Sequence, residues 1–189
     1  MVCIVVFLLC VCGCDFAGEN RTASEPRWYS NRFPENLKDV IALRAAASAK
    51  DQLEARERIA DARQQFHRGP VGRSGATKYY AESLLQMPTV EGLFGYAEAD
   101  LLMPITRETS PGCETSKRGV MERSLTYYQL AIDLSASAGE PFPEGWSHQL
   151  AEDRIACLRG YTMRNQAPSI PGCDRFIEMA MHACQTTDQ

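Results

Sequence analysis

Cysteine is the residue through which this chain is best equipped to form covalent or metal bonds, because 8 of its 189 residues are cysteine. Four lie within the first 14 residues, and the others are spread through the body as Cys113, Cys157, Cys173 and Cys184. Four thiolates could bind zinc, but the body has no Cys-x-x-Cys pair of the kind that zinc sites commonly use. In an exported chain, an even number of cysteines predicts disulfides, which here means two.

A short phrase that contains one of these cysteines occurs twice, around Cys113 and around Cys173. It reads Ser-Pro-Gly-Cys-Glu at residues 110–114 and Ile-Pro-Gly-Cys-Asp at residues 170–174. Each copy lies between two predicted amphipathic helices and places its cysteine beside an acidic residue at a helix start. We interpret the repeat as the sign of two helical hairpins, formed by residues 89–103 with 116–136 and by residues 145–163 with 174–185.

Geometry narrows the pairing of the four cysteines. Cys173 and Cys184 lie eleven residues apart on one predicted helix, which separates their Cα atoms by about 16 Å, whereas a disulfide needs about 7 Å or less. We therefore expect Cys113–Cys173 to join the two loops and Cys157–Cys184 to join the helices of the second hairpin. The remaining alternative is Cys113–Cys184 with Cys157–Cys173.

The histidines and acidic residues form no recognisable catalytic or metal site. None of His67, His148 and His182 has a second histidine at metal-ligand spacing, and we expect neither a metal nor a cofactor. The chain is therefore predicted not to be an enzyme. The enzymatic alternative is an all-α cell-wall hydrolase, which would need a buried glutamate in a cleft, and Glu98 and Glu144 are its candidates.

The overall charge argues against one large class of partner. The formal net charge is −4, whereas nucleic-acid binding needs a basic face. We therefore expect a protein or peptide partner and no nucleic acid.

Helical periodicity extends along the whole body, and no segment alternates as a strand would. Residues 35–66 favour helix but are interrupted near Ser48, where Ser48 and Asp51 form a loose capping box, so two helices are expected there. The loops are predicted at 67–76 and 104–115. The further helices are predicted at 77–86, 89–103, 116–136, 145–163 and 174–185. This pattern predicts an all-α fold of six or seven helices packed as antiparallel hairpins.

The length of the chain suits one folded domain. We assign residues 35–189 to a single all-α helical-hairpin domain and residues 14–34, which are mostly polar, to a flexible tether. Aromatic residues such as Trp28 and Phe33 are unusual in a tether, and we expect them to dock onto the body. Residues 1–13 are assigned to a signal peptide.

The first 14 residues carry no charged side chain. They are too few to cross a bilayer as a stable helix, which takes about 20 residues, but they suffice as the apolar region of a secretion signal. The end of this run, Val11-Cys12-Gly13-Cys14, resembles a bacterial lipobox. The resemblance implies cleavage after Gly13 and acylation of Cys14 by fatty acids such as palmitate. The alternatives are an ordinary secretion signal cut at the same place and a retained membrane tether.

Two segments of the body resemble the tetratricopeptide repeat family. Leu93-Phe94-Gly95-Tyr96-Ala97 is similar to the start of the first helix of a repeat, and residues 127–134, Tyr-Tyr-Gln-Leu-Ala-Ile-Asp-Leu, are similar to the second helix. The resemblance implies a stack of helices that binds a protein or peptide through a groove. The tyrosine pairs at 79–80 and 127–128 could line such a groove.

These two resemblances together predict an envelope lipoprotein that faces the periplasm or the cell exterior. It would touch the membrane only through its lipid anchor and would work as a protein–protein interaction scaffold or assembly factor. The main alternative is an inhibitor or immunity-type lipoprotein, which would insert a protruding loop such as residues 104–115 into a target enzyme.

Overall fold

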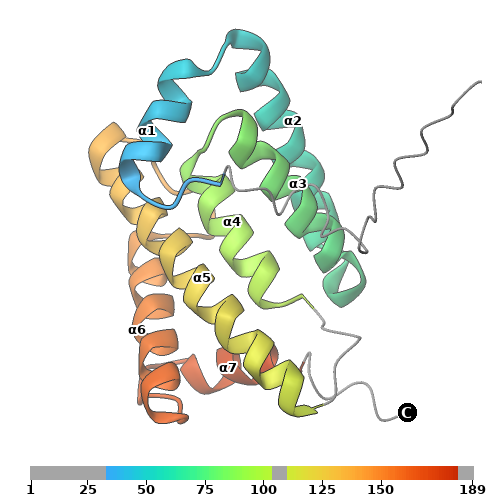
Figure 1. The fold of residues 1–189 in the computed structure, drawn as a ribbon, viewed down its shortest axis with the longest axis vertical. Coiled ribbons are helices and arrows are strands. Elements are labelled where there is room, and N and C mark those ends of the chain that lie inside the picture. The colour runs from blue at the N-terminus through green and yellow to red at the C-terminus, as the bar shows by residue number, and fades with distance from the viewer. Residues whose placement is uncertain (1–32, 104–109, 183–189) are drawn as a thin grey trace, which may run out of the picture.

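A computed structural model of the chain describes residues 33–103 and 110–182. In these residues it contains α-helices and no strand, which confirms the predicted all-α fold class (Figure 1). The elements are α1 (Leu37–Ala46), α2 (Ala49–Phe66), the 3-10 turn η2 (Gly69–Gly72), α3 (Arg73–Gln86), α4 (Val90–Leu101), α5 (Ser110–Ala138), α6 (His148–Arg164) and α7 (Cys173–His182).

Two helix starts are fixed by N-cap side chains that can be recognised in the sequence. Ser48 accepts a hydrogen bond from the Asp51 backbone N–H, while the Asp51 carboxylate accepts one from the Ser48 N–H, which is a complete capping box. Thr89 caps α4 by accepting from the Gly92 N–H at 2.9 Å. The predicted break between α1 and α2 and the predicted start of α4 are therefore confirmed.

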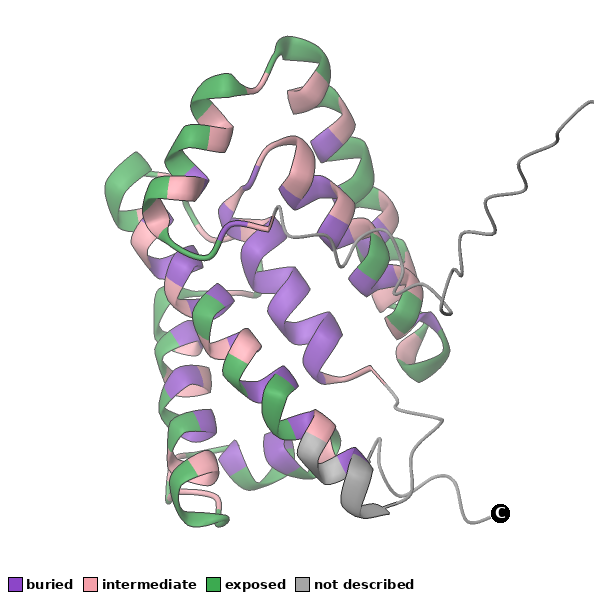
Figure 2. Ribbon diagram, in the orientation of Figure 1, coloured by how far each residue is buried: buried purple, intermediate pink, exposed green. Residues whose placement is uncertain are grey.

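Helix α4 is the centre of the molecule. It lies between α3 and α5 (Figure 1), and Figure 2 shows it buried along its length. Every residue from Val90 to Leu101 is buried except Glu91, which is half-buried. Because α4 is enclosed, Gly95 is needed where it stands: a Cβ atom there would overlap the ring of Tyr80 on α3.

Helices α3 and α5 both begin earlier than the sequence predicts. α3 starts at Arg73 instead of near residue 77, and α5 starts at Ser110 instead of near residue 116. Glycine and proline indicate loops at both places, but Pro70 lies at the start of η2 and Pro111 in the first turn of α5. A proline there fits a helix, because its missing N–H costs nothing. Residues 110–115 are therefore helical, and the rest of the predicted loop, 104–109, lies outside the described residues.

The described disulfide is Cys157–Cys173, with the two Cα atoms 5.6 Å apart. The expected pairs Cys113–Cys173 and Cys157–Cys184 are therefore wrong. The observed bond is one of the two in the alternative pairing. Cys113 is also disulfide-bonded, and Cys184 lies outside the described residues.

The position of α7 explains this pairing. The connection after α6 turns back along that helix, with Pro168 packed so closely on Gly160 that a Cβ atom there would lie 2.7 Å from the proline ring. α7 therefore begins beside the middle of α6, where Cys157 lies, and it crosses the end of the bundle (Figure 1). The second predicted hairpin, 145–163 with 174–185, does not form as an antiparallel pair.

The end of the predicted tether packs onto the body. The ring of Phe33 stacks on Tyr96 of α4 with centroids 5.7 Å apart, and Pro34 is buried. Trp28 and Cys14 lie outside the described residues. Among the helices that the structure describes, none combines the length and the apolar character needed to cross a bilayer.

Candidate functional site

A groove runs between α2 and the connection from α5 to α6, residues 139–147. It consists of two adjoining cavities of about 390 and 420 Å³ that share Arg63, Glu91 and Pro143. We call it the α2 groove. Its other lining residues are Phe66, His67, Tyr80, Glu144 and Trp146 in the first cavity and Arg56, Ile59, Ala60, Thr89, Glu140, Pro141 and Phe142 in the second.

The wall opposite α2 is held in place by Glu140. Its carboxylate accepts a hydrogen bond from the Val90 N–H at 2.8 Å, at the first turn of α4, where the helix dipole favours a negative charge. The same carboxylate pairs with Arg44 of α1 at 2.6 Å. Ser135 donates to the Glu140 carbonyl at 2.7 Å. These contacts tie the connection to three helices, so the wall is fixed although it has no regular secondary structure.

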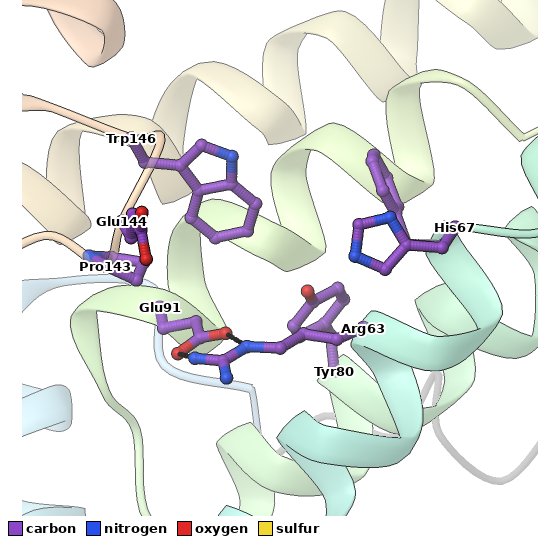
Figure 3. A pocket seen from close by; sticks show the side chains of 8 residues that line it. Arg63, His67, Tyr80, Glu91, Pro143, Glu144 and Trp146 are labelled. Carbon is purple, nitrogen blue, oxygen red and sulfur yellow. Dashed lines mark hydrogen bonds and ion pairs between the residues drawn. The ribbon is translucent and has the colours of Figure 1, made fainter.

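Aromatic side chains form much of the lining of the first cavity. Trp146 packs against the buried Phe94, with ring centroids 4.6 Å apart, and lines the cavity. Figure 3 shows Trp146 and Tyr80 facing the same space, with His67 on the far side. Burial raises the pKa of Tyr80, so its hydroxyl keeps its proton and can donate a hydrogen bond.

An ion pair crosses the floor where the two cavities meet. Arg63 of α2 donates from Nε and Nη2 to the two carboxylate oxygens of Glu91 on α4 (Figure 3). This two-pronged pairing raises the pKa of Arg63 and keeps its charge in place. The Glu91 side chain is only 14% exposed while that of Arg63 is 54% exposed, so the guanidinium is the partner that a ligand can reach.

The two glutamates considered for hydrolysis lie in different places. Glu98 is buried within the bundle, where it accepts hydrogen bonds from Arg154 at 2.8 Å and Tyr128 at 2.9 Å. Glu144 is exposed and lines the α2 groove. The structure does not bring them together, and Glu98 does not line a groove cavity.

A buried lysine near the end of α4 escaped the sequence analysis. Lys117 is fully buried and donates from Nζ to the carbonyl oxygens of Leu101 and Met103 at 2.7 and 2.8 Å. Burial lowers its pKa to about 8. A signal was present: Lys117 precedes the buried Met121 and Tyr128 by four and eleven residues, which places all three on one helix face.

The acidic neighbour of Lys117 is Asp100, which is also buried. It pairs with Arg123 at 3.0 Å, yet burial raises its pKa because the loss of hydration outweighs that charge. Its Oδ1 atom has no hydrogen-bond partner among the described residues. This acid–base cluster joins α4 to α5 and does not line the α2 groove.

The histidines are not assembled into a site. His67 lines the α2 groove, and His148 packs against Phe142 with ring centroids 6.2 Å apart. The described residues contain no group of three or more side chains able to hold a metal ion.

Comparison with family models, curated proteins and solved structures gives no match from which a function could be taken. No family model matches the chain, and neither does any curated protein or solved structure. The site must therefore be interpreted from its own chemistry.

Proposed function

We propose that this protein is a non-catalytic interaction protein whose α2 groove binds an extended segment of a partner protein. The α2 groove carries the proposal, because its aromatic lining combines with a reachable guanidinium in two joined cavities. Sites of this size, with apolar walls and a few polar groups, are typical ligand sites.

The length and lining of the groove favour a polyproline II segment. Along α2 the groove extends from Arg56 to His67, about 16 Å at 1.5 Å per residue. About five residues of a polyproline II chain span that distance at 3.1 Å each. Grooves lined by aromatic rings bind such segments because the ligand is already extended and loses little entropy. The Tyr80 hydroxyl and the Arg63 guanidinium supply donors for its carbonyl groups.

The α2 wall also favours a negative charge on the partner. Arg56 and Arg63 are exposed on that wall and both line the second cavity. Because Glu91 already occupies Arg63, Arg56 is the charge best placed to attract an acidic residue of the ligand. We therefore infer a proline-rich segment with an acidic residue at the end that lies near Arg56.

The surroundings of Glu98 support a role without catalysis. Arg154 and Tyr128 both donate to the same oxygen of this carboxylate, Oε1. A general acid needs access to substrate, and Glu98 is buried and lines neither cavity of the α2 groove. The buried glutamate is therefore best explained as part of the bundle.

Fluorescence of Trp146 gives a direct test of the groove. The chain has two tryptophans, at positions 28 and 146, so Trp28→Phe leaves Trp146 as the only reporter. We expect a saturable change in its emission with the peptide Glu-Pro-Pro-Pro-Pro-Pro. Arg56→Glu should weaken this binding about fivefold to tenfold by replacing attraction with repulsion.

Arg164→Glu is the matched control for the charge change. It alters an exposed arginine at the end of α6 that does not line the groove, and binding should stay as in the parent. An emission of Trp146 that is unaffected by the peptide, or equal weakening by both charge reversals, would overturn the peptide proposal.

The location of the protein is part of the same proposal. We infer that Cys14 is acylated and holds the body at an envelope membrane, with the folded part facing the periplasm or the exterior. Intact mass of the protein from its native host, before and after reduction, tests this. A mass with two or three acyl chains on Cys14 is expected, and a chain that still carries residues 1–13 would exclude lipoprotein processing.

A further inference from the structure

A separate cavity of about 330 Å³ lies where η2, the start of α3 and α7 come together. It shares no lining residue with the α2 groove. We call it the α7 cavity. Its lining residues are Pro70, Arg73, Leu102, Arg175, Glu178 and Met179.

Arg73 lies in this cavity with at least one of its N–H donors unpaired among the described residues. Its guanidinium lies flat on the ring of Phe66, with Cζ 3.6 Å from the ring centroid, which fixes its orientation. Its Nη1 atom is buried and has no hydrogen-bond partner in the part of the chain that is described. Glu98 acts on Arg73 through its charge but accepts its hydrogen bonds from Arg154 and Tyr128. A buried N–H donor in this state is costly until an acceptor pairs with it.

The charges and the apolar side chains of the cavity indicate which kind of anion would fit it. Among the described lining residues, Arg73 and Arg175 contribute two positive charges and Glu178 one negative charge, which leaves one positive charge to be matched. Leu102, Pro70 and Met179 supply an apolar wall. A monoanion with an apolar body matches both features, because its charge neutralises the site and its body covers the apolar wall.

We propose that the α7 cavity binds a small organic monocarboxylate, whose carboxylate lies between Arg73 and Arg175 and whose apolar body lies on Leu102 and Met179. Two planar guanidinium groups suit a carboxylate, because each can donate two parallel hydrogen bonds. The carboxylate can belong to a free acid or to the C-terminus of a peptide. This site is proposed without using the α2 groove or any partner bound there.

The methyl group of Met179 is a built-in reporter. In the mature protein labelled with ¹³C at methionine methyls, hexanoate should shift the Met179 signal saturably at constant ionic strength. The signal of Met163, which is exposed on α6 and outside the cavity, should stay in place. Arg175→Gln should weaken binding about tenfold. This variant changes an exposed side chain, so the test does not depend on how well Arg73→Gln folds.

Arg164→Gln is the matched control and should bind hexanoate as the parent does. N-acetyl-leucyl-leucine, with a free C-terminal carboxylate, distinguishes the two sources. Tighter binding of this peptide than of hexanoate assigns the site to a chain terminus, and the reverse assigns it to a free acid. An equal Met179 shift with hexanamide, equal weakening by the two glutamine variants, or no shift with either carboxylate would overturn the proposal.

Discussion

The buried residue Glu98 connects several helices of the bundle. Its carboxylate is 8% exposed and is joined to Arg154 on α6 and to Tyr128 on α5. The Arg154 guanidinium also lies over the ring of Phe176 on α7, 3.7 Å from its centroid. One ion pair therefore connects the central helix to three others, and its partners cannot be removed singly without leaving a charge in the core.

Arg154→Met tests this connection. The methionine keeps much of the packing on Phe176 but leaves Glu98 without its cation, and we expect a loss of about 3 kcal/mol in the free energy of unfolding by urea. Arg58→Met is the matched control, because Arg58 pairs with Glu82 at the surface, and it should cost less than about 1 kcal/mol. Equal losses would show that the buried pair has no special role.

Lys117 predicts an unusual dependence of stability on pH. Its folded pKa of about 8 lies below the ordinary value of 10.5, so between these pH values the unfolded chain binds more protons than the folded one. The free energy of unfolding should therefore rise with pH in that window. Relative to Lys117→Met, the parent should gain about 2 kcal/mol between pH 7.5 and pH 9.5. Parallel pH profiles in urea would contradict the assignment.

At the scale of elements, α4 depends on close approach to α3. Gly95→Ala would push a methyl group into the Tyr80 ring, and overpacking of this kind costs about 2–3 kcal/mol. It would also displace Tyr80 toward the α2 groove, so peptide binding should weaken as well.

Gly119→Ala is the counterpart of that change on another helix. Gly119 lies in α5 with no atom near its missing Cβ, and alanine there should raise the free energy of unfolding by about 0.5–1 kcal/mol. Thermal unfolding monitored by circular dichroism measures both variants. A stabilised Gly95→Ala would mean that α3 and α4 are not packed as described.

The elements that could be predicted from the sequence are those fixed by neighbours along the chain. Ser48 and Thr89 cap helix starts with their own side chains, so these two starts could be predicted from the local sequence. The start of α5 was not, because Pro111 and Gly112 suit both a loop and a first turn. Which of the two forms depends on packing against α4, and that information is not local.

The α2 groove illustrates the same limit for a site. Its walls, α2 and residues 139–147, lie more than seventy residues apart in the sequence. Tyr80 could be proposed as a lining residue from its pairing with Tyr79, but Arg63 and Trp146 carry no signal that links them. Lys117 was not predicted as buried, although its spacing from Met121 and Tyr128 on one helix face was a local signal that could have indicated it.

At the scale of the whole molecule, the α2 groove and the α7 cavity, the two proposed binding sites, are joined by one stacked pair. Phe66 lines the α2 groove and Arg73 lines the α7 cavity, and the two side chains are in contact. Any ligand that reorients Arg73 must therefore disturb the groove wall. Double titration with the proline-rich peptide and hexanoate measures the coupling, which by thermodynamic necessity is equal in both directions.

The bond between Cys157 and Cys173 makes the end of α6 and its connection to α7 a covalent ring. Arg164 lies inside that ring at the exposed C-terminal end of α6, so a protease can reach the chain there. A single cut there would add the mass of one water and release no fragment until a reductant is added. Mass spectrometry of trypsin-treated protein checks this outcome, and a fragment lost without reductant would refute it. The chain could thus be nicked at this corner and remain one molecule.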